Sequence, residues 1–162
     1  MTTTGRGLPA QQQDGVRVVG PGQGQIAGAE DAAMMIKISS DETDGRWALL
    51  AGSSAPGFES GLHRHAEGAK GFHVIEGTYE FYADGRWLDV GAGDTVFVPA
   101  GAVHGFRAGP NGGRGLVIYP GRQERWFAQV AEAGGPAAIG AAAAAAISAS
   151  HGVTQCGPLP PR

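Results

Sequence analysis

His63 and His65 are the residues whose type and spacing point most directly to chemistry. They stand two positions apart in the segment from Gly57 to His73, GFESGLHRHAEGAKGFH. Side chains at this spacing point about 200° apart on a helix but to the same face of a β-strand. A strand with two imidazoles on one face can present both nitrogens to a single metal ion. The segment therefore predicts part of a metal site that needs at least one further ligand.

His104 is the candidate third ligand because of the turns that precede it. In GDTVFVPAGAVH, a turn at Gly93-Asp94 leads into a predicted strand, and a second turn at Pro99–Gly101 leads to His104. A strand that returns after a tight turn would bring His104 beside the inward face of the earlier strand. We therefore expect His63, His65 and His104 to converge as a facial set of imidazoles.

The elements that must position these residues are short β-strands. Apolar runs alternate with turn sequences such as EG, ADG and GAGD, which predicts about seven to nine strands before residue 120 and an all-β sandwich or barrel. Met34–Ile38 and Arg46–Gly52 are predicted to form an antiparallel pair, and Asp84-Gly85 is predicted to be a hairpin turn. Further strands are predicted at Val103–Arg107 and Arg114–Tyr119.

After residue 120 the periodicity changes to that of a helix. Trp126, Phe127 and Val130 lie at helical spacing, which predicts an amphipathic helix of about three turns. Ala137–Ala149 is predicted to form a second, weakly docked helix because its apolar stripe is thin. We expect a flexible N-terminal tail over residues 1–15, a barrel with the first helix over residues 16–135, and an Ala-rich helix with an extended tail over residues 136–162.

Composition and charge exclude several classes of partner. The net charge is −3 with both signs interspersed, which favours neither nucleic acid nor an anionic membrane as a partner. No apolar run approaches the roughly 20 residues that a membrane helix needs. The first residues lack a basic-then-apolar signal pattern, so we expect a cytoplasmic protein. The single cysteine, Cys156, cannot form an internal disulfide.

The two histidine-bearing segments resemble the two motifs of the cupin superfamily. The first motif is G, five residues, H-x-H, three or four residues, E, six residues and G; this chain supplies, at that spacing, Gly57, His63, His65 and Gly77. The second is G, five residues, P-x-G, two residues, H, three residues and N, which is matched by Gly93, Pro99, Gly101 and His104. The flanking sequences FHVIEGTYEF and PGRQERWF also resemble those of small quercetinase-like cupins. The resemblance covers about residues 30–135.

This resemblance implies an all-β fold: a single cupin double-stranded β-helix barrel with one or two C-terminal α-helices. It also implies that His63, His65 and His104 hold a divalent metal ion inside the barrel. Iron, nickel and zinc are all compatible with neutral imidazole ligands. A small-molecule substrate and pairing into a homodimer are further implications of the resemblance.

The chain departs from the family pattern at two positions. Lys70 stands where the first motif has its metal-binding Glu, and Ala108 stands where the second has Asn. A protonated lysine would repel a metal ion, since like charges about 4 Å apart in a partly dry site cost several kcal/mol. Three outcomes remain open: Lys70 turns away, it loses its proton and becomes a general base, or the barrel holds no metal. Glu67 is a weaker candidate for a substitute carboxylate ligand.

The wall of the expected pocket follows from strand parity. Tyr79 and Phe81 share one face of their strand, and Phe106 shares a face with His104, which would give an aromatic cavity. The hydroxyl of Tyr79 could contact a substrate. His73 is expected to point outward, since it alternates with inward-facing neighbours.

The function favoured by the resemblance is that of a metal-dependent oxidoreductase, a dioxygenase for a small enolic or phenolic substrate. Lys70 would then neutralise or deprotonate the enolate oxygen. One alternative is a non-redox cyclase, isomerase or dehydratase with a Lewis-acid metal, in which Lys70 moves the proton. Another is a metal-free barrel that binds a small molecule. The sequence leaves these open, because one fold hosts many chemistries.

Overall fold

A computed structural model describes residues 11–13, 15–29 and 31–162 of the chain. The strands are β1 (Gln11–Gln13), β2 (Val16–Val18), β3 (Gln25–Ala29), β4 (Ala32–Ile38), β5 (Trp47–Ser54), β6 (Leu62–His65), β7 (Lys70–Ala83), β8 (Arg86–Gly91), β9 (Thr95–Val98), β10 (His104–Pro120) and β11 (Val153–Gly157). The helices are the 3₁₀ helix η1 (Ser40–Thr43), α1 (Arg125–Glu132) and α2 (Pro136–Ser150).

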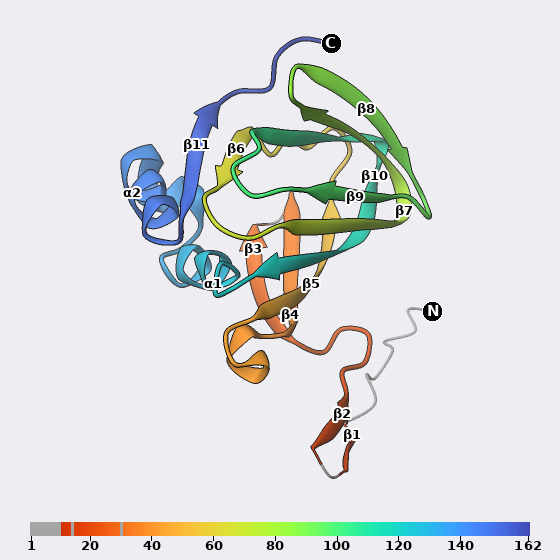
Figure 1. The fold of residues 1–162 in the computed structure, drawn as a ribbon, viewed down its shortest axis with the longest axis vertical. Coiled ribbons are helices and arrows are strands. Elements are labelled where there is room, and N and C mark those ends of the chain that lie inside the picture. The colour runs from red at the N-terminus through yellow and green to blue at the C-terminus, as the bar shows by residue number, and fades with distance from the viewer. Residues whose placement is uncertain (1–10, 14, 30) are drawn as a thin grey trace.

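Nine of these strands form one antiparallel sheet, β3 to β11, that curls into a barrel (Figure 1). The predicted antiparallel pair is confirmed as β4 and β5, and β10 lies on the other side of β5. The predicted hairpin turn is also confirmed: Asp84 and Gly85 join β7 to β8 with φ angles of 50° and 79°. Both residues have positive φ, which is the conformation that a two-residue hairpin requires.

The long strands β7 and β10 form the centre of the barrel and carry most of the residues that face inward. The two separate strands predicted around residues 103–119 are joined in β10, which has an irregularity between Ala108 and Gly113 where it pairs with β7. In β7 the pairing skips Ile75, since Val74 pairs with Gly115 and Glu76 with Arg114. This bulge changes the parity of the strand. Even-numbered residues therefore face the interior before the bulge, and odd-numbered residues after it.

The core of the barrel is aromatic. Phe72, Tyr79 and Phe81 are almost fully buried, and their ring centroids lie 5.2–6.4 Å apart. Two glycines of β10 make room for these rings. A Cβ atom on Gly113 would lie 2.5 Å from the ring of Tyr79, and one on Gly115 would lie 3.1 Å from the ring of Phe72.

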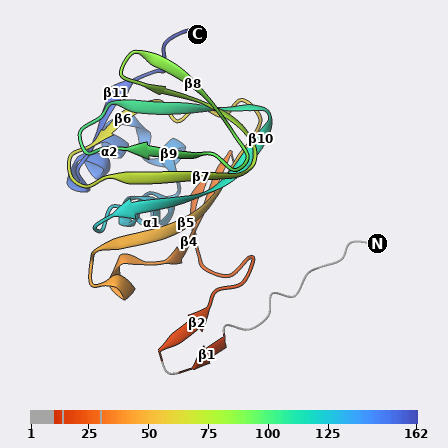
Figure 2. The same ribbon diagram turned by 45° about the vertical axis from the view of Figure 1, so that its right-hand side comes forward.

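The N-terminal hairpin of β1 and β2 is a separate two-stranded sheet that projects from the barrel in both views (Figures 1 and 2). Strand β1 lies within the segment expected to be a flexible tail. Residues 1–10 of that segment lie outside the described residues. Arg17 of β2 links the hairpin to the body, because it forms an ion pair with Glu42 of η1.

The two C-terminal helices lie together on one side of the barrel, where α1 packs against β3 and α2 against β11 (Figure 1). Helix α1 has eight residues and is shorter than expected, since the residues before Arg125 form turns. Helix α2 contains a break at Gly140, and Trp126 of α1 donates a hydrogen bond to Ser148 at 2.9 Å. None of the helices in the described part of the chain is long and apolar enough to span a membrane.

The segment after α2, expected to be an extended tail, returns to the sheet as β11. It pairs with β6, so that Val153 lies opposite His65 and Gln155 opposite His63. The histidine-bearing strand is therefore held between β11 and the start of β10.

Candidate metal centre

Three histidines converge on the inner face of the barrel. His63 and His65 project from β6, and His104 is the first residue of β10, where it pairs with His63. The centroids of the imidazole rings lie 4.4–5.5 Å apart, and one nitrogen of each ring lies within 4.8 Å of the others. The structure thus brings together the three side chains that the sequence expected to converge.

Each of the three rings is held through its Nδ1 atom by an oxygen acceptor. The Nδ1 atom of His63 lies 3.2 Å from the carbonyl oxygen of Gly61, and that of His104 lies 2.9 Å from the carbonyl oxygen of Ala102. The Nδ1 atom of His65 lies 2.6 Å from Oε1 of Gln123. Because carbonyl oxygens only accept hydrogen bonds, each Nδ1 carries the proton and each Nε2 keeps a lone pair.

The Nε2 atom of His104 gives an independent indication that a metal ion fits here. It is buried and has no hydrogen-bond partner among the described residues. A buried polar atom without a partner costs free energy, and a metal ion would supply the missing contact. Three Nε2 lone pairs, each backed by a bonded Nδ1 proton, form a donor set that suits a divalent transition metal.

Lys70 points into the same site rather than away from it. Its Nζ atom lies 3.2 Å from Nε2 of His65 and 3.4 Å from Nε2 of His63, and 5.3 Å from the centre of the Tyr119 ring. The side chain is buried, and burial lowers the pKa of Lys70 to about 7. Of the three outcomes left open by the sequence, a Lys70 that turns away is wrong. The amine competes for the lone pairs that a metal ion would use.

The electrostatics keep the three imidazoles neutral near pH 7. Burial, followed by the charge of Lys70, lowers the pKa of His65 to about 3 and that of His104 to about 4. The same two causes, in the same order, lower the pKa of His63 well below its usual value. Neutral imidazole is the form that binds a metal ion, so the site needs no proton release from its ligands at neutral pH.

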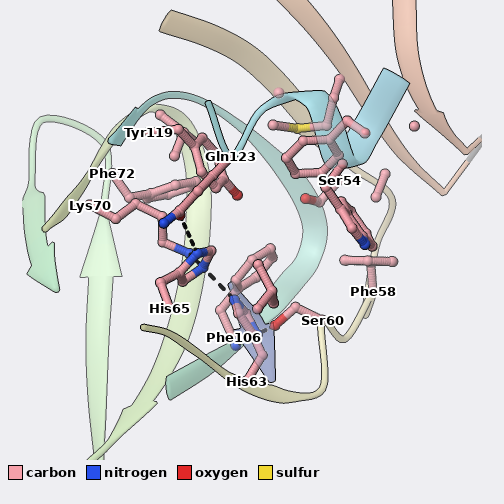
Figure 3. Close-up of a pocket in the computed structure, with 18 of the residues that line it drawn as sticks. Ser54, Phe58, Ser60, His63, His65, Lys70, Phe72, Phe106, Tyr119 and Gln123 are labelled. Atoms are coloured by element: carbon pink, nitrogen blue, oxygen red, sulfur yellow. Dashed lines mark hydrogen bonds between the residues drawn. The ribbon is translucent and has the colours of Figure 1, made fainter. Parts of the chain in front are cut away.

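His63 and His65 form part of the wall of a cavity of about 220 Å³, and His104 is buried beside them. Figure 3 shows His63, His65 and Lys70 pointing toward one another, with Ser54 and Phe58 on the opposite side. The expected wall residues Tyr79, Phe81 and Phe106 all line the cavity. Burial raises the pKa of Tyr79, while a hydrogen bond from Ser54 acts in the opposite direction.

Several residues that line the cavity were not expected from the sequence. They are supplied by β4, by the end of β10, by the turn and helix that follow it, and by β11; among them are Met34, Tyr119, Gln123, Trp126, Phe127, Val153 and Gln155. Helical spacing did predict an apolar face for α1, but it could not show that this face covers the barrel. Gln123 gave no signal, because a lone glutamine before a helix is an ordinary surface residue.

Two other candidates lie outside the cavity. His73 is exposed on β7 and bonds to Thr95 at 2.9 Å, so the expectation that it points outward is confirmed. Glu67 is exposed, and its backbone carbonyl accepts a hydrogen bond from Gln123 at 2.8 Å.

The comparisons with known proteins agree with this geometry. Residues 53–119 match the family described as Cupin domain. Quercetin 2,3-dioxygenase from Bacillus subtilis is 26% identical over 111 residues, which are 68% of this chain but 33% of that protein. The chain thus spans about a third of the length of this curated relative.

Two solved structures of bacterial proteins illustrate the similarity of the fold. An RmlC-like cupin from Shewanella frigidimarina aligns with a TM-score of 0.56 and 18% identity, over 74% of this chain and 99% of that one. The polyketide cyclase RemF from Streptomyces resistomycificus aligns with a TM-score of 0.51 and 29% identity, over 58% of this chain and 68% of that one. The domain match over residues 53–119, the curled antiparallel barrel and the inward-facing histidines together support a cupin superfamily protein.

Proposed function

We propose that this chain is a metal-dependent cupin oxidoreductase, a dioxygenase that acts on a small enolic or phenolic substrate. The observation that carries the proposal is the convergence of three histidines, two of which, His63 and His65, line an aromatic cavity. The similarity to a quercetin 2,3-dioxygenase supports it, although the chain matches only a third of that enzyme.

The proposed metal ligands are His63, His65 and His104, and the ion is divalent: iron or nickel for the dioxygenase, or zinc for a non-redox reaction. Three imidazoles on one side leave open positions on the other side, toward the cavity. A redox-active ion bound there would supply dioxygen chemistry next to a chelating substrate. The rest of the chemistry must come from residues of the chain.

Lys70 is the proposed proton acceptor. Its amine lies at the same wall as the three Nε2 atoms, and burial favours its neutral form. A neutral amine can take the proton of an enolic or phenolic hydroxyl. The resulting ammonium would then stand beside the enolate oxygen and stabilise its charge, which few groups in a largely apolar cavity could do.

The aromatic walls would hold and orient a planar ring. Phe72, Tyr79, Phe81 and Phe106 form a contiguous cluster with ring centroids 5.2–6.4 Å apart. Such rings stack on flat substrates and exclude water from the reacting atoms. The cavity therefore favours a small aromatic or conjugated molecule over a sugar or a peptide.

Metal analysis combined with oxygen consumption tests the proposal. Protein purified without chelators is assayed for bound metal, loaded with iron(II) or nickel(II), and given a panel of enols, catechols and flavonols in an oxygen electrode. The proposal expects one metal per chain and oxygen uptake that matches substrate loss one to one. Protein that neither retains nor takes up metal would contradict it and favour a metal-free binding barrel.

A non-redox function is a second candidate, favoured by the placement of Lys70 and by the similarity to a polyketide cyclase. In that case the metal acts as a Lewis acid and Lys70 transfers a proton during cyclisation, isomerisation or dehydration. Substrate turnover at the same rate under nitrogen and under air would support this candidate over the dioxygenase.

We also propose that the chain pairs as a homodimer through the outer face of the barrel. Ile26, Phe97 and Ile118 are 77%, 72% and 50% exposed on strands of the main sheet. Phe97 and Ile118 both lie opposite Gly71 of β7, so these two exposed apolar side chains are near neighbours on the sheet, as at an interaction surface. Light scattering coupled to size-exclusion chromatography should find a dimer that Phe97→Glu dissociates, whereas Leu88→Glu on β8 serves as a control. A monomeric wild-type protein would refute the pairing.

A further inference from the structure

We propose that Gln123 is a positioning residue of the metal centre, which holds His65 in the tautomer and orientation that ligation requires. The inference rests on the proposed metal-dependent function. Gln123 lies in the turn between β10 and α1, is buried, and contacts the candidate metal centre at the ring of His65. We expect its effect on the metal to pass through the His65 ring.

The orientation of the Gln123 amide follows from its two contacts. On one side it lies 2.8 Å from the backbone carbonyl oxygen of Glu67, which can only accept a hydrogen bond. The amide NH₂ group must therefore face Glu67, and the amide oxygen must face His65, where it lies 2.6 Å from Nδ1. An oxygen at that position requires a proton on Nδ1. The Nε2 lone pair of His65 is thereby directed to the other edge of the ring, toward the site.

His65 differs from the other two histidines in the group that bonds to its Nδ1 atom, which is a side chain rather than a backbone carbonyl. His63 and His104 each donate to the backbone carbonyl two residues earlier, Gly61 and Ala102, so their tautomers are fixed within their own segments. His65 depends on a side chain 58 residues away in the sequence. It is therefore the ligand whose orientation a single side-chain substitution can release.

The turn that carries Gln123 is itself anchored to η1 on the opposite side. Both Arg122 and Arg125 donate to Oδ1 of Asp41, at 2.8 and 2.6 Å. Glu124 is buried and accepts hydrogen bonds from the backbone nitrogen and the hydroxyl of Ser40, at 2.8 and 2.5 Å. Arg122, Glu124 and Arg125 thus bond to η1. Gln123, which lies among them, bonds instead to His65.

Lys70 holds the His65 ring from the other edge, since Nζ lies 3.2 Å from Nε2. That contact also requires a lone pair on Nε2 when the amine donates, and so it agrees with the same tautomer. Once His65 gives this lone pair to a metal ion, Lys70 can no longer use it. Gln123 then remains as the polar contact that keeps the ring in place. Loss of the hydrogen bond to the non-ligating nitrogen of a histidine ligand typically weakens metal binding by about 10–100-fold.

The test compares three variants of the full chain. Gln123→Met keeps the size of the side chain and removes the acceptor, whereas Gln123→Glu keeps an acceptor for Nδ1. Gln129→Met is the matched control, because Gln129 lies on α1, is exposed and bonds to His151 at 2.8 Å. The first readout is the ¹⁵N-resolved NMR spectrum of the histidine rings in metal-free protein. The second is the affinity for zinc, measured in competition with a chromophoric chelator.

We expect a protected Nδ1 proton on His65 in the wild type, in Gln123→Glu and in Gln129→Met. In Gln123→Met this proton should be lost, or should exchange with solvent at least about tenfold faster, and zinc affinity should fall about 10–100-fold. Rescue of both readouts by Gln123→Glu would support positioning through the hydrogen bond. A Gln123→Met protein that keeps the protected proton would overturn the inference, and so would one that loses the proton but binds zinc as tightly as the wild type.

The two proposals fail in different ways. Wild-type protein that binds no zinc, iron or nickel contradicts the proposed function. The NMR comparison of Gln123→Met with Gln129→Met then still decides whether Gln123 holds the His65 tautomer, because it uses metal-free protein. Circular dichroism of each variant separates either result from a loss of the fold.

Discussion

The side-chain nitrogen of Lys70 lies 3.2 Å from Nε2 of His65 and 3.4 Å from Nε2 of His63. A basic amine therefore lies within the set of lone pairs that a metal ion would use. Burial lowers the pKa of Lys70 to about 7, so above neutral pH the amine is mostly neutral and does not repel a cation. We therefore expect changes at Lys70 to alter both metal affinity and stability.

Replacing Lys70 with Glu should strengthen metal binding. The carboxylate would stand where the amine now lies, remove a competing base and add an oxygen ligand. We expect zinc or nickel affinity to rise by at least about tenfold, which corresponds to about 1.4 kcal/mol. Titration against a competing chelator measures this, with Lys70→Met as the uncharged control. Weaker binding by Lys70→Glu than by Lys70→Met would show that the carboxylate does not reach the site.

The stability of the metal-free protein should depend on pH through Lys70. Burial lowers the pKa of Lys70 from 10.5 to about 7. Between these values the unfolded chain binds a proton at Lys70 that the folded chain does not, so the free energy of unfolding rises with pH by up to about 1.4 kcal/mol per unit.

From pH 7 to pH 9, the wild type should gain about 2 kcal/mol relative to Lys70→Met. Urea denaturation in the presence of a chelator measures both proteins at each pH. Parallel stability profiles would mean that Lys70 is charged, or solvated, in the folded state.

The buried histidines should lower the stability of the protein as the pH falls below about 6.5, a lower pH range than that in which Lys70 acts. Burial and the charge of Lys70 lower the pKa values of His65 and His104 to about 3 and about 4. As the pH falls below about 6.5, the unfolded chain protonates these rings while the folded chain resists, so stability is lost. A His65→Phe variant should lose less stability than the wild type between pH 6.5 and pH 4.5 in thermal unfolding. An identical loss in both proteins would contradict the assignment.

Removing His104 should abolish metal binding. Its Nε2 atom is buried and without a partner among the described residues, and the remaining two imidazoles make a much weaker site. We expect His104→Ala to retain less than about a tenth of the wild-type metal content by elemental analysis. His73→Ala is the control, since His73 is exposed and bonds to Thr95. Full metal content in His104→Ala would refute the three-histidine site.

Glu124 should contribute mainly to stability. Its carboxylate is buried and accepts two hydrogen bonds from Ser40, so Glu124→Ala leaves the buried donors of Ser40 unpaired. We expect a loss of about 2–4 kcal/mol in the free energy of unfolding. Glu132→Ala, at an exposed position of α1, should change it by less than about 0.5 kcal/mol. Similar effects of both substitutions would mean that the contact with Ser40 adds little.

The local spacing of residues was sufficient to predict that three histidines converge, and to predict most of the strands around them. His63 and His65 share a face because strand side chains alternate, and this holds wherever the strand lies. The turns before His104 and the hairpin at Asp84-Gly85 are likewise short-range features, because glycine, proline and aspartate favour turns through their local backbone preferences. The same alternation predicted that His73 points outward, which the structure confirms.

Tertiary packing decided what surrounds these ligands. Gln123 reaches His65 from 58 residues away, and β11 pairs with β6 from the far side of α2. Such contacts depend on how strands and helices stack, and no spacing within either segment encodes them. The depth of the barrel also decides that the Lys70 amine is desolvated, since its pKa depends on what covers it. The sequence by itself thus determined which side chains could hold a metal ion, because that depends on local alternation. Only the fold decided how those side chains are oriented, buried and opposed by Lys70, because those properties arise from contacts between distant segments.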